Sequence, residues 1–215
     1  MESSLDLPLV VAVPQPSRGG SVRLQPGSCE LVLESVRGGH SLLWSDGRTS
    51  RRFALGLIDE GRLTLELRAP RLPVRVITRD VISLVPGGRL RGYLQVPLVP
   101  SLVWHREGAQ PAVLIELLPR ELAAEWDDRE GHSFRSPSSL HARFPMRTGE
   151  PRVVVPVVLT NPSANVASPP HVPLQLMDSE LVELRRTVVV KPRRLRWMGE
   201  QFAIDAKHTG VQVQP

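Results

Sequence analysis

The sequence is poor in several residue types that common functional sites require. Its 215 residues include a single cysteine, Cys29, which excludes a disulfide within the chain and a cysteine-rich zinc site. Aromatic residues make up only 4% of the chain, so the core must be built from Val, Leu and Ile. Lys191 and Lys207 are the only lysines, and the other basic residues are arginines. No apolar run approaches the about 18–20 residues of a membrane-spanning helix.

Charge and cysteine content also bear on location and partners. The net charge of +5 is modest, and acidic residues are interspersed among the arginines. This distribution does not form the basic stripe that is typical of nucleic-acid binding, so such a partner is disfavoured but stays open. Residues 1–14 carry Glu2 and Asp6 and lack the basic start of a signal peptide. We expect a cytoplasmic protein without a cofactor, and any association with a membrane would go through a partner or the protein surface.

Short apolar runs separated by turn residues fill most of the chain, which contains 21 prolines and 16 glycines. Leu63, Leu65 and Leu67 alternate with polar residues, which predicts a strand with one solvated face. Asp46–Gly47 and Glu60–Gly61 are turn signals between such strands. The pattern predicts an all-β protein, an antiparallel β-sandwich of one large or two successive β domains. The expected division is a β-sandwich at 1–100, a connector at 101–110, and a second domain or second half of the same sandwich at 111–215.

Two segments test this prediction locally. ELAAEW (121–126) has Ala and Glu at favourable positions, which predicts one short helix near 120–127, followed by a long loop at 127–139. VPGGRLRGYLQVPLVP (85–100) predicts a hairpin in which strands at 81–85 and 89–96 flank a Pro-Gly-Gly turn, with a bulge at Gly92. A phosphate-binding loop would require a helix after the glycines, which this stretch does not offer.

Three groups of residues are candidates for binding or chemistry. A hairpin between 181–190 and 194–204 would gather basic residues that suit nucleic acid or anionic lipid: Arg185, Arg186, Arg193, Arg194 and Arg196, with Trp197 beside them. The polar stretch after Trp126 offers weak metal or acid–base candidates for a metal-dependent hydrolase: Asp127, Asp128 and His132. Residues at irregular strand edges and loops are interface candidates: Pro97, Pro100, Asn161, Pro162, Pro169 and Pro170.

Two longer stretches together resemble a known family. LPVRVITRDVISLVPGGRLRGYLQVPLVPSLVW contains a strand, a Pro-Gly turn and a strand that closes on V-P-L, and RVVVPVVLTNPSANV is followed later by RLRWMGEQFAIDA. In this order they resemble the domain of unknown function 432 family over about residues 45–206. The segment PRELAAEWDDREGHSFRSP lacks the aromatic, glycine-rich stretch and the Cys-Arg-aromatic step of that family.

The resemblance bears on partners rather than on chemistry. The family has no established catalytic residues, and its genes tend to lie beside those of small-conductance mechanosensitive channel proteins. The resemblance therefore implies an accessory subunit of such a channel. Together with the proline-bearing edges, it leads us to expect a non-enzymatic protein-interaction or accessory structural subunit, which binds a protein partner or forms a homo-oligomer. We further expect that deleting residues 161–170 leaves the fold intact and weakens complex formation.

Overall fold

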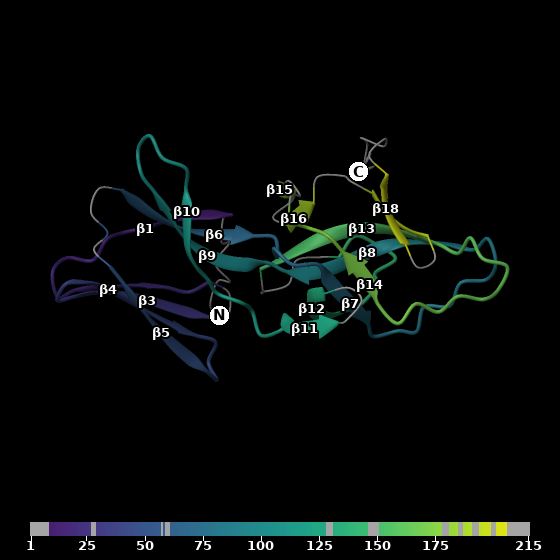
Figure 1. Cartoon of the computed structure of the whole chain (residues 1–215), viewed down its shortest axis with the longest axis horizontal. Helices are drawn as coiled ribbons and strands as arrows, with labels where there is room; N and C mark the ends of the chain where they lie inside the picture. The colour runs from purple at the N-terminus through teal and green to yellow at the C-terminus, as the bar shows by residue number, and fades with distance from the viewer. Residues whose placement is uncertain are drawn as a thin grey trace. The chain divides into compact units, whose positions relative to one another are not determined.

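The structure is a computed structural model that describes residues 9–26, 29–56, 58, 61–127, 131–145, 151–177, 181–184, 187–190, 194–198 and 201–205. For Asp127 and for those of these residues that lie within 182–205 it describes the backbone alone. The chain divides into two units with interleaved segments (Figure 1). Unit 1 comprises Met1–Arg68, Leu98–Arg120 and Thr148–Pro151, and unit 2 comprises Ala69–Pro97, Glu121–Arg147 and Arg152–Pro215.

Unit 1 contains two four-stranded antiparallel sheets. Its strands are β1 (Val10–Val13), β2 (Ser21–Leu24), β3 (Glu30–Val36), β4 (Gly39–Ser45), β5 (Ser50–Leu55), β6 (Arg62–Arg68), β9 (Val99–His105) and β10 (Ala112–Glu116). Sheet A has the strand order β1-β6-β9-β10, and sheet B is the meander β2-β3-β4-β5. The turn signal Asp46–Gly47 connects β4 to β5 as expected, with Gly47 at a φ of 81°.

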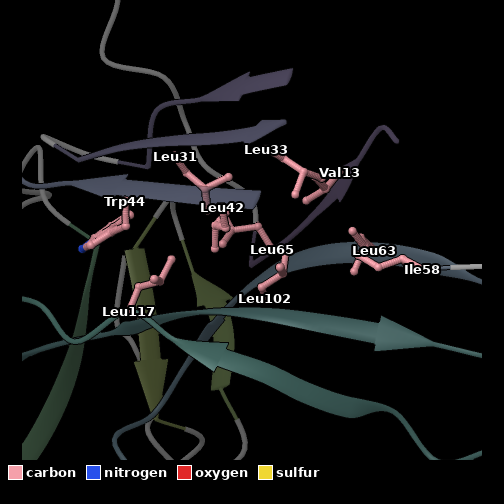
Figure 2. Close-up of a cluster of buried hydrophobic side chains, with 10 residues drawn as sticks. All are labelled: Val13, Leu31, Leu33, Leu42, Trp44, Ile58, Leu63, Leu65, Leu102 and Leu117. Carbon is pink, nitrogen blue, oxygen red and sulfur yellow. The ribbon is translucent and has the colours of Figure 1, made fainter. Parts of the chain in front are cut away.

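The core of unit 1 lies between these two sheets (Figure 2). Alternate residues of each strand point inward, because successive side chains in a strand project to opposite faces. Ten buried side chains form the core cluster: Val13, Leu31, Leu33, Leu42, Trp44, Ile58, Leu63, Leu65, Leu102 and Leu117. Full burial of each such leucine contributes about 1.5–3 kcal/mol, so this cluster is the main source of stability in unit 1.

Unit 2 contains sheets C and D. Its strands are β7 (Val74–Thr78), β8 (Arg89–Pro97), β11 (Ala123–Asp127), β12 (Gly131–Ser138), β13 (Arg152–Thr160), β14 (Val172–Leu174), β15 (Leu181–Leu184), β16 (Thr187–Val190), β17 (Arg194–Met198) and β18 (Gln201–Asp205). Sheet C has the order β11-β12-β7-β14, and β12 runs parallel to β7. Sheet D is built on β13, which pairs with β8 along its whole length. Six of the nine residues of β13 are valine or leucine and are buried, which suits an inner strand.

One proline explains how sheet D divides. Along the edge of β13 opposite β8, β16 pairs in parallel before Pro156 and β17 pairs in parallel after it. Tyr93 of β8 lies opposite Pro156 of β13 and exchanges both backbone hydrogen bonds with His141. The backbone N–H and C=O groups of Tyr93 therefore point away from β13. Pro156 therefore directs its own backbone toward β16 and β17. Because proline has no N–H, the ladder is interrupted there, and two hairpins share one edge.

These observations confirm the all-β fold, and the two antiparallel sheets of unit 1 pack as the expected sandwich, whereas unit 2 mixes antiparallel with parallel pairs. They also correct four details. The prediction of a helix near 120–127 is wrong, because residues 123–127 form β11, which pairs with β12 in a hairpin. A six-residue helix is too short to be stable without strong packing. The loop at 127–139 is largely β12. The first half of the expected connector at 101–110, residues 101–105, belongs to β9, an inner strand of sheet A. The partner of β8 is β13, not residues 81–85.

Candidate functional site

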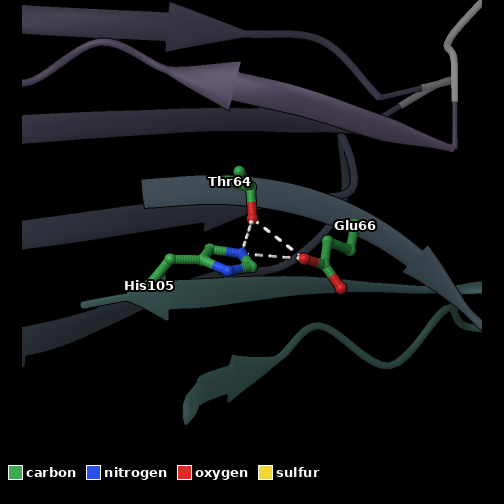
Figure 3. Close-up of polar contacts among 3 residues, drawn as sticks. All are labelled: Thr64, Glu66 and His105. Atoms are coloured by element: carbon green, nitrogen blue, oxygen red, sulfur yellow. Dashed lines mark hydrogen bonds and ion pairs between the residues drawn. The ribbon is translucent and has the colours of Figure 1, made fainter. Parts of the chain in front are cut away.

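A polar cluster in unit 1 joins three side chains of sheet A (Figure 3). Thr64 and Glu66 are two residues apart on β6, so they share a face, and His105 on β9 is the diagonal neighbour of Thr64. His105 Nε2 lies 2.8 Å from Thr64 Oγ1 and 3.0 Å from Glu66 Oε1, and Thr64 Oγ1 donates to Glu66 Oε1 at 3.0 Å. The three groups satisfy one another, and Thr64 is only 4% exposed.

The geometry of this cluster does not match nucleophilic catalysis. A hydroxyl–imidazole–carboxylate triad contacts the two ring nitrogens separately, so that a proton can enter at one and the ring is oriented through the other. In this cluster the threonine and the glutamate both contact Nε2 of His105. A proton on that nitrogen is donated to the carboxylate, and the threonine hydroxyl is buried away from any substrate. The cluster therefore ties β6 to β9.

Next to His105 lies a shallow pocket of about 450 Å³, lined by Gly61, Arg62, His105, Arg106, Glu107 and Ala109. Sequence reasoning missed this region, because the alternation of β6 indicated a solvated face and His105 is distant in the chain. Among the residues that the structure describes, no group of three His, Cys, Asp or Glu side chains is placed to hold a metal ion.

Unit 2 presents a second candidate, an apolar surface on two loops. Residues 81–85 are extended and alternate in burial, with Ile82 and Leu84 buried. Val81 is 89% exposed and Val85 is 63% exposed, so both project to the opposite side. Two of the three outward positions of this segment are therefore exposed valines, with the exposed Ser83 between them, although the segment is anchored to the core through Ile82 and Leu84.

The second loop brings a third valine to this surface. Leu84 and Ala167 exchange two backbone hydrogen bonds of 2.9 Å in an isolated antiparallel bridge. Val85 and Val166 flank this bridge and therefore lie opposite each other. Val166 is 61% exposed. Figure 1 shows both loops extending past the ends of β8 and β13. We call the surface of Val81, Val85 and Val166 the valine tip.

A buried asparagine holds the two loops together. Asn161 is 1% exposed, and its Nδ2 donates to the backbone oxygens of Leu84 at 2.8 Å and Asn165 at 2.7 Å. Its Oδ1 accepts from the backbone N–H of Ser163 at 3.0 Å. Its backbone also bonds to the turn before β8, accepting from Gly87 and donating to Gly88. The polar groups of Asn161 are thus used to fix the position of the loops that carry the exposed valines.

The turn next to the tip follows from its sequence. Gly88 donates to the backbone oxygen of Val85 at 2.8 Å, which closes a four-residue turn with Pro86 and Gly87 in the centre. Gly87 has a φ of 67°, which a type II turn requires at this position and which glycine adopts without strain. The expected Pro-Gly-Gly turn is therefore confirmed. Pro86 is exposed and adds to the apolar surface.

The arginine candidates are only partly described. Arg185, Arg186 and Arg193 lie outside the described residues. Arg194, Arg196 and Trp197 belong to β17, whose backbone pairs with β18 on one side and β13 on the other. The expected hairpin between 181–190 and 194–204 is wrong, because β15 pairs with β16 and β17 pairs with β18. Each segment folds back on itself locally, which brings its own ends together at a lower entropic cost.

The interface candidates separate into buried and exposed residues. Pro97 and Pro100 are buried, which removes them from an exposed contact surface. Pro100 occupies an inner strand, where its oxygen accepts from the N–H of Leu117 and its missing N–H falls on that same side, at the end of the β9–β10 pairing, so the reciprocal bond to Leu117 is not formed. Asn161 is a buried framework residue. Pro162 and Pro170 are exposed, and Pro169 is half-buried.

The described part of the acidic stretch belongs to the β11–β12 hairpin. Asp127 pairs with Gly131 at the end of the β11–β12 hairpin, and Asp128 lies outside the described residues. His132 pairs with Trp126, and their rings meet edge to face with centroids 4.5 Å apart. This contact accounts for the position of the His132 ring without a metal.

No family model, curated protein or solved structure matches the chain. The resemblance drawn from the sequence motifs therefore stays a prediction. In the part of the chain that the structure describes, no helix is both long enough and apolar enough to cross a membrane.

Proposed function

We propose that the protein is a non-enzymatic accessory module that works by docking on another surface, and that the valine tip is its contact surface. The observation that carries the proposal is the combination of three exposed valines with a buried framework. Hydration of exposed apolar surface is unfavourable. A segment fixed by the buried hydrogen bonds of Asn161 would gain stability if these valines turned inward or were polar. Their exposure on a fixed framework is typical of an interaction site.

The polar cluster of unit 1 supports the non-enzymatic part of this proposal. His105, Glu66 and Thr64 are engaged with one another in an arrangement that leaves the hydroxyl buried. A protein partner, including the channel-type membrane protein that the family resemblance implies, belongs to the same proposal.

The test compares complexes formed in the native host by three forms of the tagged chain. These are the wild type, a tip variant (Val81→Ser, Val85→Ser, Val166→Ser) and a matched control that alters exposed valines of unit 1 (Val10→Ser, Val36→Ser). Soluble and membrane fractions are analysed separately after cross-linking. We expect the wild type and the control to be retained in the same complex or fraction and the tip variant to be lost from it. Identical distribution of all three forms, with the tip variant folded, would contradict the proposal.

A further inference from the structure

The charges around the valine tip are strongly one-sided. Residues 79–92 contain three arginines, Arg79, Arg89 and Arg91, and one acid, Asp80, which gives this segment a net charge of +2. Residues 158–170, which supply the other loop, contain no charged residue. All four charged side chains of the first segment are exposed. An apolar tip next to a basic rim is therefore built into the end of unit 2.

The three arginines are available for an external partner. Within the described part of the chain, none of them forms an ion pair, whereas other arginines, such as Arg23 and Arg52, pair with glutamates. Arg89 directly follows the turn that carries Val85, and Arg91 lies two residues further on β8, on the same face as Arg89. Their long side chains can reach past the strand end while their charge stays in water.

The size of the tip favours one class of partner. A stable protein–protein interface buries about 800 Å² on each partner, so a protein partner would have to contact unit 2 beyond the three valines and the neighbouring Pro86 and Pro162. Binding to a bilayer surface requires less area. A few apolar side chains enter the boundary between headgroups and acyl chains, and basic residues beside them interact with anionic headgroups. Arg79 and Arg89 flank Val81 and Val85 in the sequence, Arg91 follows on β8, and all of these side chains are exposed, which fits this division of roles.

We infer that the valine tip docks unit 2 on an anionic lipid bilayer, with the three valines inserted at the interface and the three arginines at headgroup level. This inference rests on the proposed docking function and names the chemistry of its partner surface. Binding is then peripheral, and it weakens when salt screens the arginines.

The first experiment measures co-sedimentation of the purified full-length chain with vesicles. One set is phosphatidylcholine alone, and the other contains about 30% phosphatidylserine, an anionic lipid. We expect binding to the anionic vesicles that falls as NaCl rises from about 0.05 M to about 0.5 M. The tip variant should lower the partition coefficient about tenfold or more, because apolar burial is lost. Arg89→Gln with Arg91→Gln should lower it about fivefold for each arginine.

Matched controls separate the tip from the general charge and apolarity of the chain. Val10→Ser with Val36→Ser alters exposed valines of unit 1, and Arg37→Gln with Arg48→Gln removes the same charge from exposed positions of unit 1. Both should bind vesicles as the wild type does. Equal binding by the tip variant, or an equal loss in the controls, would overturn the inference. Near-ultraviolet circular dichroism checks that every variant is folded.

A second measurement reports insertion directly. In a Cys29→Ser background, Val85→Cys is labelled with an environment-sensitive fluorophore, and Val10→Cys serves as the comparison site. We expect a blue shift with anionic vesicles at position 85 and none at position 10. Absence of a shift at both positions, together with no sedimentation of the wild type, would overturn the lipid inference.

The outcomes distinguish the inference from the proposed function. If the wild type does not bind vesicles but the tip variant loses a cross-linked protein, the docking function stands and the partner is a protein instead of a bilayer. Tip-dependent, salt-sensitive binding to a homopolymeric RNA without vesicle binding would also overturn the lipid inference. Wild-type behaviour of the tip variant in cells and on vesicles would contradict both.

Discussion

The two units use the same aliphatic residues in different ways. In unit 1 every strand pair is antiparallel, and sheet B is a meander whose neighbours in sequence are neighbours in space. In unit 2 the central pair joins β8 to β13, which are far apart in the chain, and three pairings are parallel. Distant pairing requires loops that cross the ends of the sheet, and those loops carry the valine tip. Unit 1 is therefore mostly a packed core, whereas unit 2 also positions an exposed surface.

The difference also concerns how polar groups are buried. The core cluster of unit 1 is apolar, and its polar cluster ties two adjacent strands. In unit 2 a buried asparagine bonds to two loops from distant parts of the chain. Loss of a core side chain should therefore weaken unit 1 through packing, and loss of Asn161 should weaken unit 2 through the hydrogen bonds that link its loops.

The largest effect is expected from Leu42→Ala in the core of unit 1. Leu42 is fully buried between sheets A and B, so its truncation removes apolar contacts and leaves a cavity. We expect a loss of about 3–4 kcal/mol in the free energy of unfolding, measured by urea denaturation. Leu114→Ala, at a partly exposed position of β10, is the control and should cost much less. Equal losses for the two variants would show that the cluster is not the centre of the core.

Asn161→Ala tests the framework of unit 2. The substitution removes the four hydrogen bonds of the Asn161 side chain, which contribute about 0.5–1.5 kcal/mol each, so we expect a loss of about 2–3 kcal/mol in the free energy of unfolding. Hydrogen exchange should show reduced protection at the amides of Leu84 and Ala167. Asn165→Ala, at an exposed position, is the control. Unchanged protection in the Asn161 variant would mean that the loops are held by other contacts.

The same bonds correct the expectation that deleting residues 161–170 leaves the fold intact. That deletion removes Asn161, the bridge partner Ala167 and the hydrogen bonds to the turn at Gly87 and Gly88. The substitutions of exposed valines are therefore the appropriate way to test the tip, because they leave the framework in place.

Gly92→Ala tests the close approach of two segments in unit 2. A Cβ at this position would meet the backbone oxygen of His141 at 2.9 Å and the side chain of Leu140 at 2.8 Å. We expect a loss of about 1–2 kcal/mol, measured by denaturation. Gly56→Ala, which meets open space, is the matched control and should change stability by less than about 1 kcal/mol. A tolerated Gly92→Ala would show that the segment at 140–141 can move away.

Gly92 also illustrates what the sequence alone could not predict. A glycine within a strand predicts either a bulge or the close approach of another segment. The register of β8 and β13 is continuous through Gly92, so the second reason applies, and the bulge is wrong. The segment at His141 is distant in sequence, and nothing in the local pattern of β8 indicates it.

Periodicity predicts which residues share a face, but it does not identify the partner strand. For this reason the strands near 30–36, 40–45 and 62–68 were predictable, and so were the turns at Asp46–Gly47 and Pro86–Gly87. The β8–β13 pair and the division of sheet D at Pro156 depend on contacts between distant segments. The valine tip was hidden for the same reason, because Val85 and Val166 become neighbours only through the Leu84–Ala167 bridge.

The smallest effect is a pH dependence in the Asp46 turn of unit 1. Asp46 Oδ1 accepts from the backbone N–H groups of Thr49 at 2.7 Å and Arg48 at 2.9 Å. The bond from Thr49 has the larger effect and the bond from Arg48 the next, and both lower the pKa of Asp46 below its ordinary value of 3.8. The folded state therefore favours the carboxylate, and its stabilising contribution is full above pH 3.8 and is lost as pH falls through the lowered pKa.

Asp46→Asn should remove this contribution and reduce the acid sensitivity of the thermal midpoint Tm. The expected result is a smaller drop in Tm between neutral and acidic pH for the variant than for the wild type, since the variant has no proton to take up at this position. Asp80→Asn is the control, because the backbone oxygen of Asp80, rather than its carboxylate, accepts the hydrogen bond from Thr78. An equal change in both variants would assign the acid sensitivity to net charge instead of to the turn. A difference confined to Asp46→Asn would place the acid sensitivity in the β4–β5 hairpin of unit 1 and not in the segment of unit 2 that contains Asp80.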